Sequence, residues 1–442
     1  MNHSEMKVAV DEVIEAKERV VKHLRGQYTQ GKIGLYEIEA KIHEFTLWVG
    51  DVMVKELIEQ LPEPTQANRI VVEEQVAVFE GVRNLRFINR FGEEVVRPRR
   101  CYRFVNQPGG FVPLDAELGM DHCWGFSPQM SYLMSLFGAD EPFGSAAGKL
   151  STAVGFPVSP SAVQRTTEQI GERIPEEPGQ LIEAKKQQES CEVMVIEADG
   201  TLSGQIHEEE GLRGHESLKQ PLEYKEANLV VIEKYEDGER RERWTGARYG
   251  PRSEFETYAG KAGVAMGFLK ACKAVFLGDG AHQNWELQQT HFPGATPILD
   301  FYHALEHLGT FTTLLTEEPR AYQDAQSWPQ RLKDGEVLEV IAEMKGLLPQ
   351  LSDTAEGWRQ INYFQRNQHR MHYDLYRQLG YPIGSGLVEG QCKFVIAKRF
   401  KGSGMRWKRH DNECTLRTRL AYLNDQLPRY FAPLPQQWRP AA

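Results

Sequence analysis

The sequence predicts a mixed α/β protein in which helical and β-rich regions alternate along 442 residues. In some regions apolar residues recur at spacings of three and four, which is typical of amphipathic helices. In others, short apolar runs end at Gly, Asp or Pro, which is typical of strands. With 40% apolar and 26% charged residues, the composition is that of ordinary globular domains. No apolar run approaches the roughly 20 residues that a membrane-spanning helix needs, so no membrane partner is expected.

The first 64 residues are predicted to be helical. Six apolar residues form a stripe along one helix face, namely Leu35, Ile38, Ile42, Phe45, Val49 and Val52. Residues 61–64 (LPEP) then end the helix, because proline cannot continue its hydrogen-bond ladder. The stripe is short for a coiled coil, so it is expected to pack against the chain's own core rather than against a second copy.

Residues 65–126 are predicted to form a small basic β module. Short β-type runs separated by turn residues cover positions 71–112. Seven arginines against two glutamates lie between positions 83 and 103. A charge run of this kind is typical of a solvated face as well as of a nucleic-acid contact, so it does not assign a partner by itself.

Residues 127–185 return to a helical pattern. An amphipathic helix reaches Val154, a turn follows at positions 155–158, and Ser159 or Ser161 can cap a second helix that runs to Ile174. Two helices joined by a short glycine-containing turn have the outline of a helix-turn-helix DNA reader. An ordinary helical hairpin has the same outline, and the pattern leaves both open.

The following region alternates strands with helices. Strands are predicted at residues 191–200, 229–238, 240–250, 274–280 and 296–300. Residues 255–270 have helical spacing, and residues 303–380 are mainly helical. A glycine-rich turn then opens into a further helix.

Three acidic residues stand where sites commonly assemble in α/β proteins. Asp199 and Asp279 each follow an apolar strand and precede a glycine, and Glu389 begins a helix after a Gly-Ser-Gly turn. Carboxylates from three separate elements can form a hard-oxygen site for Mg²⁺ or Mn²⁺. Taken singly, each has an ordinary explanation. Asp-Gly is a common turn, and Glu389 suits a first helical turn or an i,i+4 pair with Lys393.

Charge is distributed unevenly along the chain. The formal net charge is −10, yet residues 389–442 contain eleven Lys and Arg against four Asp and Glu. An acidic body with basic segments permits a nucleic-acid partner in spite of its overall sign. The six cysteines include no CxxC pair, and the charged N-terminus lacks the apolar stretch of a signal peptide. Reduced thiols in a cytoplasmic protein are therefore expected.

Between residues 111 and 407 the chain resembles the DDE transposases of bacterial insertion sequences, of the ISKra type, which are relatives of the Mutator-like group. The blocks that carry the resemblance, in family order, are GFVPLDAELGM (110–120), SPSAVQRTTEQIG (159–171), IEADGT (196–201), FLGDGAHQNW (276–285), HFPGATPILDFYHALEHL (291–308) and YPIGSGLVEGQCKFVIAKRFKGSGMRW (381–407). The last three blocks are the most specific.

The resemblance implies an α/β RNase H-like catalytic core with an all-α insertion. It assigns the catalytic, metal-binding acids to Asp199, Asp279 and Glu389, which are separated by 80 and 110 residues. These acids would hold Mg²⁺ or Mn²⁺, as two ions about 4 Å apart. Asp300 and His303 match a D-x-x-H signature of the group. We expect His303 to lie near the scissile phosphate or to orient a carboxylate, and a purely structural role is the alternative.

The function implied is that of a transposase, which cleaves DNA at the ends of an insertion sequence and transfers the strands into target DNA. Its partner is then double-stranded DNA, both terminal repeats and target. A dimer or larger assembly is expected because two DNA ends must be brought together. The protein is expected to be bacterial, cytoplasmic and associated with the nucleoid. The residues expected to contact DNA are Arg97, Arg99, Arg100, Arg165, Lys398, Arg399, Lys401, Arg406, Lys408 and Arg409.

Two other functions stay open at this point. An RNase H-like nuclease specific for branched DNA or hybrids would use the same carboxylates without strand transfer. An inactive, domesticated transposase would keep only DNA binding.

One departure from the family pattern concerns zinc. A zinc knuckle of paired cysteines commonly precedes the GFVPLD block in such transposases, but this chain has only Cys101, His122 and Cys123 in the vicinity. These residues do not make a convincing tetrahedral set, so no structural zinc is expected.

The domain organisation follows from these regions. It comprises an N-terminal helical region (1–64), the basic β module (65–126), the helix-turn-helix-like segment (127–185), the first part of the RNase H-like core (186–309), an all-α insertion (310–380), and the last core helix with a basic tail (381–442).

Overall fold

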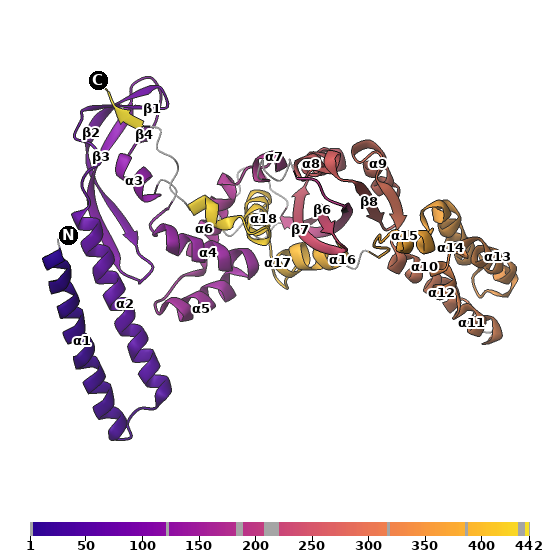
Figure 1. Ribbon diagram of the computed structural model, residues 1–442, viewed down its shortest axis with the longest axis horizontal. Coiled ribbons are helices and arrows are strands. Elements are labelled where there is room, and N and C mark those ends of the chain that lie inside the picture. Colours follow the sequence, from indigo (N-terminus) through magenta and orange to yellow (C-terminus); the bar gives the residue numbers. More distant parts are fainter. Residues whose placement is uncertain are drawn as a thin grey trace. The chain divides into compact units, whose positions relative to one another are not determined.

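The structure is a computed structural model of the whole chain (Figure 1). It describes residues 3–120, 123–182, 189–206, 221–315, 319–384, 388–431 and 438–441. The chain divides into two compact units, Met1–Ile170 with Leu427–Ala442, and Gly171–Gln426. Within the described residues, no helix combines the length and the apolar character that crossing a bilayer requires.

The first unit begins with two long helices, α1 (His3–Thr29) and α2 (Leu35–Gln60). The side chain of Glu37 accepts a hydrogen bond from the backbone N–H of Gly34 (2.9 Å), which satisfies a donor at the start of α2. The helix ends at Leu61, immediately before Pro62.

The apolar stripe of α2 is largely exposed, so the prediction that it packs against the chain's own core is wrong. Leu35, Ile42 and Val52 are 69%, 47% and 42% exposed. Near the end of the helix, Ile58 is buried in a cluster with Phe87 and other residues of the neighbouring sheet. The helix therefore projects beyond the sheet on which its last turns pack.

The first unit contains an antiparallel sheet with strand order β10-β1-β2-β3-β4. Its strands are β1 (Arg69–Val72), β2 (Gln75–Ile88), β3 (Glu94–Phe104), β4 (Gly110–Phe111) and β10 (Trp438–Pro440). The edge strand β10 pairs with β1, with Val71 opposite Arg439. Residues 438–440 thus belong to this sheet. The sequence did not predict this strand, because it has only three residues and one of them is proline.

Helices follow this sheet in the chain, namely α3 (Pro113–Leu118), α4 (Pro128–Asp140), α5 (Phe143–Val154) and α6 (Pro160–Arg173). Met130, Met134 and Leu150 are buried in the core that α4, α5 and α6 share. The Ser159 side chain accepts the N–H of Ala162 (3.2 Å), as expected for a helix cap. The predicted helices on either side of the turn at 155–158 are therefore confirmed.

The second unit is built on a mixed sheet with strand order β7-β6-β5-β8-β9. Its strands are β5 (Val193–Ile206), β6 (Leu222–Glu236), β7 (Glu239–Tyr249), β8 (Lys273–Gly278) and β9 (Thr296–Leu299). The pairs β5–β6 and β6–β7 are antiparallel, whereas β5–β8 and β8–β9 are parallel.

Strand β5 is longer than predicted. It continues through Asp199 and Gly200 to Ile206 because it stays paired with β6, whereas its pairing with β8 stops at Glu197 opposite Leu277. The Asp-Gly sequence here is part of a strand and not the turn that ends it.

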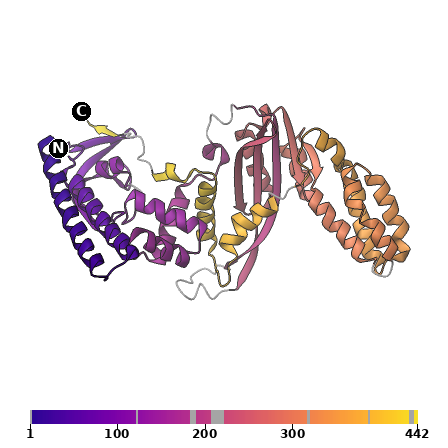
Figure 2. The ribbon, with the colours of Figure 1, turned by 60° about the horizontal axis from the view of Figure 1, so that its bottom comes forward.

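Helices pack around this sheet (Figure 2). They are α7 (Pro178–Leu181), α8 (Arg252–Ala265), α9 (His282–His291), α10 (Phe301–Thr313) and α18 (Arg409–Leu423). A helix formed by α16 (Val388–Gln391), a π-helical stretch (Cys392–Ala397) and α17 (Lys398–Phe400) packs against β5.

Between β9 and α16 the described chain is helical. After α10 come α11 (Pro319–Ala325), α12 (Trp328–Lys333), α13 (Val337–Leu347), α14 (Thr354–Asn367) and α15 (Tyr373–Gln378). Short 3₁₀ turns lie at Phe268–Lys270, Leu348–Gln350, Gln368–Arg370 and Leu427–Phe431. The helical character predicted for residues 303–380 is confirmed for the residues described.

A glycine fixes the close approach of α6 to α18 in the second unit. A Cβ added at Gly171 would lie 2.0 Å from the carbonyl oxygen of Cys414. We therefore expect Gly171→Ala to destabilise the protein by about 1–3 kcal/mol, because backbone must move to admit the methyl group. Thermal unfolding measures the effect. The matched control is Gly148→Ala in α5, where nothing lies within 4 Å of the added atom, and a Gly171→Ala protein as stable as this control would contradict the argument.

Candidate active site

Three aspartates follow the ends of neighbouring parallel strand segments. The parallel pairing of β5 with β8 stops at Glu197 opposite Leu277, two residues before Asp199 and Asp279. The pairing of β8 with β9 stops at Gly278 opposite Leu299, one residue before Asp279 and Asp300. Continuing both registers sets the three aspartates side by side along the carboxyl edge of the sheet, where α/β proteins commonly form their sites.

Asp279 is held by the loop that follows β8. Its Oδ1 accepts the backbone N–H of Ala281 and the side-chain N–H of Asn284, both at 2.9 Å. Gly280 has φ 94°, a left-handed conformation that favours glycine. Tyr363 of α14 donates its hydroxyl hydrogen to the Asp279 carbonyl (2.8 Å), which attaches the helical region to this loop.

Arg252 determines how Asn284 faces Asp279. The Arg252 guanidinium donates to Oδ1 of Asn284 (2.8 Å) and to Oδ1 of Asn228 (2.9 Å). Because the Asn284 oxygen is taken by Arg252, its NH₂ group is the one directed at the Asp279 carboxylate. This network orients the carboxylate as outer-shell residues orient metal ligands. Arg252, Asn284 and Tyr363 were not predicted from the sequence. Arg252 and Tyr363 are distant from Asp279 in the chain, and only the fold brings them to its loop.

Asp199 lies in a half-buried position beside a second acid. Burial raises the pKa of its carboxyl above the usual range, and the charge of Asp279 raises it further. The backbone N–H of Gly200, at 2.6 Å from Oδ1, and the thiol of Cys392 oppose this rise through hydrogen bonds. The carboxylates of Asp199 and Asp279 are thus close enough to repel, and a cation bound between them would relieve that repulsion.

His303 carries positive charge at this edge of the sheet. Asp300 is buried, caps α10 by accepting the backbone N–H of His303 (2.8 Å), and lies 3.5 Å from its Nδ1. The hydrogen bond that the His303 ring donates to the Asp300 carboxylate raises the pKa of His303 to about 9, although burial lowers it in part. The charges of Asp279 and Glu306 add to the rise. At neutral pH His303 is therefore an imidazolium, suited to bind an anionic group.

Glu389 lies in α16, the start of the helix that packs against β5. One turn later on this helix, Cys392 hydrogen-bonds Asp199. The fold thus brings the backbone of Glu389 to the strand that carries Asp199. The Glu389 side chain, with Ser385 and Gly386 of the preceding turn, lies outside the described residues.

A groove of 730 Å³ lies beside Asp279 and includes Gly280 in its wall. It runs between α9, α10 and α14, and its lining combines aromatic and cationic side chains. The Arg370 guanidinium lies 4.2 Å from the centroid of the Trp285 ring, and the His307 ring stacks on Tyr363 at 3.5 Å. Arg359 and Arg366 also line the groove, together with Glu286 and Glu356, and Glu356 forms an ion pair with Arg359. Arginines and aromatic rings are groups that bind nucleic-acid phosphates and stack on bases.

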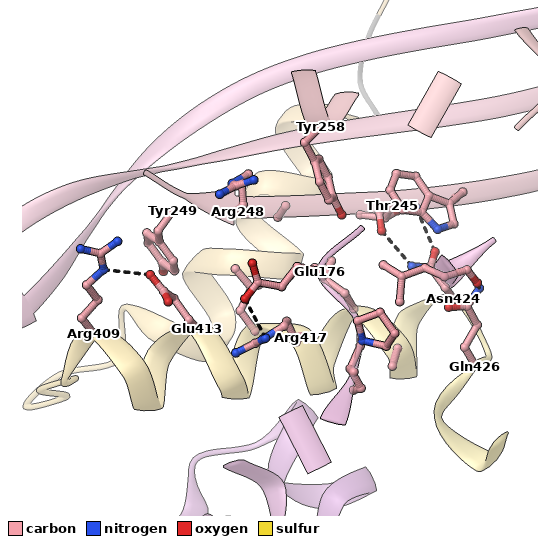
Figure 3. A pocket seen from close by; sticks show the side chains of 18 residues that line it. Glu176, Thr245, Arg248, Tyr249, Tyr258, Arg409, Glu413, Arg417, Asn424 and Gln426 are labelled. Atoms are coloured by element: carbon pink, nitrogen blue, oxygen red, sulfur yellow. Dashed lines mark hydrogen bonds and ion pairs between the residues drawn. The ribbon is translucent and has the colours of Figure 1, made fainter. Parts of the chain in front are cut away.

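A second cavity, of 180 Å³, lies in a different part of the second unit (Figure 3). It lies between β7, α8 and α18, and none of the three aspartates lines it.

Three of the predicted DNA-contacting arginines have partners inside the first unit. Arg97 donates to the carbonyls of Glu59 and Leu61. Arg99 forms an ion pair with Asp115 at 2.6 Å. The Arg100 guanidinium lies 3.8 Å from the centroid of the Phe79 ring. Their contact with DNA stays a prediction, as does that of Arg165, which is exposed on α6.

The basic residues near the end of the core divide into two classes. Lys398, Lys401, Arg406 and Arg409 are exposed and Lys408 is half-buried, and Lys401 donates to the Thr201 hydroxyl (2.5 Å) close to Asp199. Arg399 is fully buried, with its guanidinium 4.9 Å from the Trp407 ring centroid. The prediction that Arg399 contacts DNA is therefore wrong, because this side chain belongs to the core.

All six cysteines are described, and each is a free thiol in the structure. Cys101 is buried in the first unit and Cys123 is half-buried. His122, the third residue considered for a zinc site near them, lies outside the described residues. The expectation of no zinc at this place stays a prediction.

Comparison with known proteins gives little at the sequence level. No protein-family model matches the chain, and no curated protein matches it. Among solved structures, the chain is similar to the "Drosophila P element transposase strand transfer complex", with 10% sequence identity and a TM-score of 0.29. The match covers 72% of this chain and 83% of that chain.

The pair of His303 and Asp300 makes stability depend on pH. A raised histidine pKa contributes stability that is complete below the ordinary value of 6.5 and is lost as pH rises through about 9. Asp300→Asn keeps the capping oxygen but removes the charge. We expect the variant to have a lower free energy of unfolding than wild type at about pH 6. This difference should shrink by on the order of 2 kcal/mol by about pH 10. Urea unfolding measures this difference, and a difference that does not change with pH would contradict the assignment.

Proposed function

We propose that the chain is a DDE-type transposase with an RNase H-like core, which cuts DNA at the ends of a mobile element and joins the cut strands to target DNA. The observation that carries the proposal is the position of Asp199 and Asp279, each two residues past the last pair of the parallel β5–β8 ladder, with the helix of Glu389 against β5. The strand order β7-β6-β5-β8-β9, in which β6 runs antiparallel to both β7 and β5, supports such a core.

The donor set fits a hard divalent cation. Asp199, Asp279 and Glu389 offer only carboxylate oxygens, which Mg²⁺ and Mn²⁺ prefer. The charge of Asp279 contributes to the raised pKa of the Asp199 carboxyl, so the two acids lie close enough together for a cation to bind between them. Bound ions of this kind would activate the attacking oxygen and stabilise the leaving oxygen during displacement at phosphorus.

The chain's own residues would position the reactants. Asn284 and the Ala281 N–H fix the Asp279 carboxylate, and Arg252 fixes Asn284. His303, as an imidazolium, would hold a phosphate oxygen near the aspartates. The arginines and rings of the groove beside Asp279 would hold the strand that leads into the site.

The reaction divides into two displacements with no covalent link to the protein. In cleavage, a water oxygen bonds to phosphorus, the bond from phosphorus to the 3′ oxygen breaks, and a free 3′-OH results. In strand transfer, this 3′-OH bonds to a phosphorus of the target, whose own 3′ oxygen leaves. Each step forms one phosphorus–oxygen bond and breaks one.

The proposal is tested by cleavage of labelled duplexes that cover the DNA on either side of the coding sequence, with Mg²⁺ or Mn²⁺. Asp279→Asn keeps the acceptor for Ala281 and Asn284 but loses the charge. We expect it to lower the cleavage rate by more than about 100-fold while DNA binding is retained.

The matched control is Asp237→Asn, because Asp237 is exposed in the β6–β7 hairpin with φ 53°, which Asn tolerates. This control should cut at the wild-type rate. Cutting without joining would indicate a nuclease, and binding without cutting in either metal would indicate an inactive relative. Cutting by Asp279→Asn at a rate within tenfold of wild type would remove the assignment.

A further inference from the structure

A second cluster of potential metal ligands lies on α18, apart from the aspartates. His410 and Cys414 are separated by four residues and therefore lie on one face of this helix. Glu172, near the end of α6, faces both of them. Its Oε1 lies 3.0 Å from His410 Nε2, which in turn lies 3.6 Å from the Cys414 sulfur. The three ligand atoms lie within 4.8 Å of one another.

These separations fit the edges of a tetrahedron around zinc. With zinc about 2.0–2.1 Å from nitrogen and oxygen and about 2.3 Å from sulfur, tetrahedral angles set N and S about 3.6 Å apart and N and O about 3.3 Å apart. In the structure these two separations are 3.6 Å and 3.0 Å, and the carboxylate oxygen lies within 4.8 Å of the sulfur. A small adjustment of the exposed Glu172 or His410 side chain would reach the ideal values.

The backbone fixes the positions from which the ligands project. Gly171 precedes Glu172, and its missing side chain lets α6 approach the carbonyl of Cys414 closely. Cys414 itself is fully buried, so its sulfur has little freedom. Two helices in this contact hold the three ligands at a set spacing before any ion binds.

Arg417 contacts the sulfur of Cys414. Arg417, one turn further on α18, approaches the Cys414 sulfur to 3.4 Å and also forms a 3.0 Å ion pair with Glu176 (Figure 3). Arg417, held by Glu176, is therefore placed to orient the Cys414 side chain, as residues outside the first coordination shell commonly orient metal ligands.

We propose that Glu172, His410 and Cys414 bind one Zn²⁺ ion, with water as the fourth ligand. Binding would release the thiol proton to solvent and join the last turn of α6 to α18. A sulfur, nitrogen and oxygen donor set selects Zn²⁺ over Mg²⁺. The site is separate from the carboxylate site and from the region of Cys101 and Cys123 where zinc was not expected.

The test is Co²⁺ titration of the full chain, since cobalt replaces zinc and reports its ligands by absorption. We expect a thiolate-to-cobalt charge-transfer band and the visible bands of tetrahedral cobalt, both abolished by an equimolar amount of Zn²⁺. Cys414→Ser should lose the charge-transfer band. His410→Ala, at an exposed position that should not disturb folding, should weaken Zn²⁺ binding by about 100-fold or more in competition with a chromophoric chelator.

Matched variants locate the signal. Cys272 and His282 are exposed elsewhere in the same unit, so Cys272→Ser and His282→Ala should bind as wild type does. Cys392→Ser and Asp279→Asn should keep the cobalt band, which separates this site from the aspartates. The proposal is overturned if wild type gives no charge-transfer band, if Cys414→Ser retains it, or if Cys392→Ser removes it.

Discussion

The candidate active site depends on the parallel pairing of β8 with strands on both of its sides. This pairing fixes the backbone of three chain segments in register and leaves an aspartate shortly beyond each. Like charges so placed repel, and the raised pKa of Asp199 reflects both that repulsion and burial. The sheet supplies the rigidity that keeps these groups together in spite of their charge.

The surrounding residues compensate this charge in different ways. The charge of Asp300 is balanced by His303, whose pKa is raised to about 9. Asp279 receives two hydrogen bonds on a single oxygen, from Ala281 and Asn284. Asp199 receives the Gly200 N–H and the Cys392 thiol. Asp300 is thus a partner for His303, while Asp199 and Asp279 are the acids suited to a cation.

The sequence predicted those parts of the fold that short-range patterns determine. The apolar run before Asp279 is β8, the run before Asp300 is β9, and Ser159 caps α6 as its position suggested. Each of these features is decided by a few neighbouring residues. The chemistry of Asp199 and Asp279 was inferred from the same local signals together with a family resemblance.

Other features depend on contacts between distant residues and could not be predicted. Strand β5 passes through Asp199 because β6 stays paired with it, and β10 forms because β1 offers an open edge. The charge of Arg399 suggested a contact with DNA, but its side chain is buried with the guanidinium against Trp407. The links of Arg252 and Tyr363 to the Asp279 loop join residues that are 27 and 84 positions away from Asp279 in the chain.

The central claim is that Asp199 and Asp279 together hold a divalent cation, and anomalous diffraction from crystals grown with Mn²⁺ tests it most directly. We predict a manganese peak within coordination distance of carboxylate oxygens of both aspartates, with Asn284 still bonded to Asp279. Manganese bound only elsewhere on the chain, with both aspartates free of metal at saturating Mn²⁺, would contradict the account.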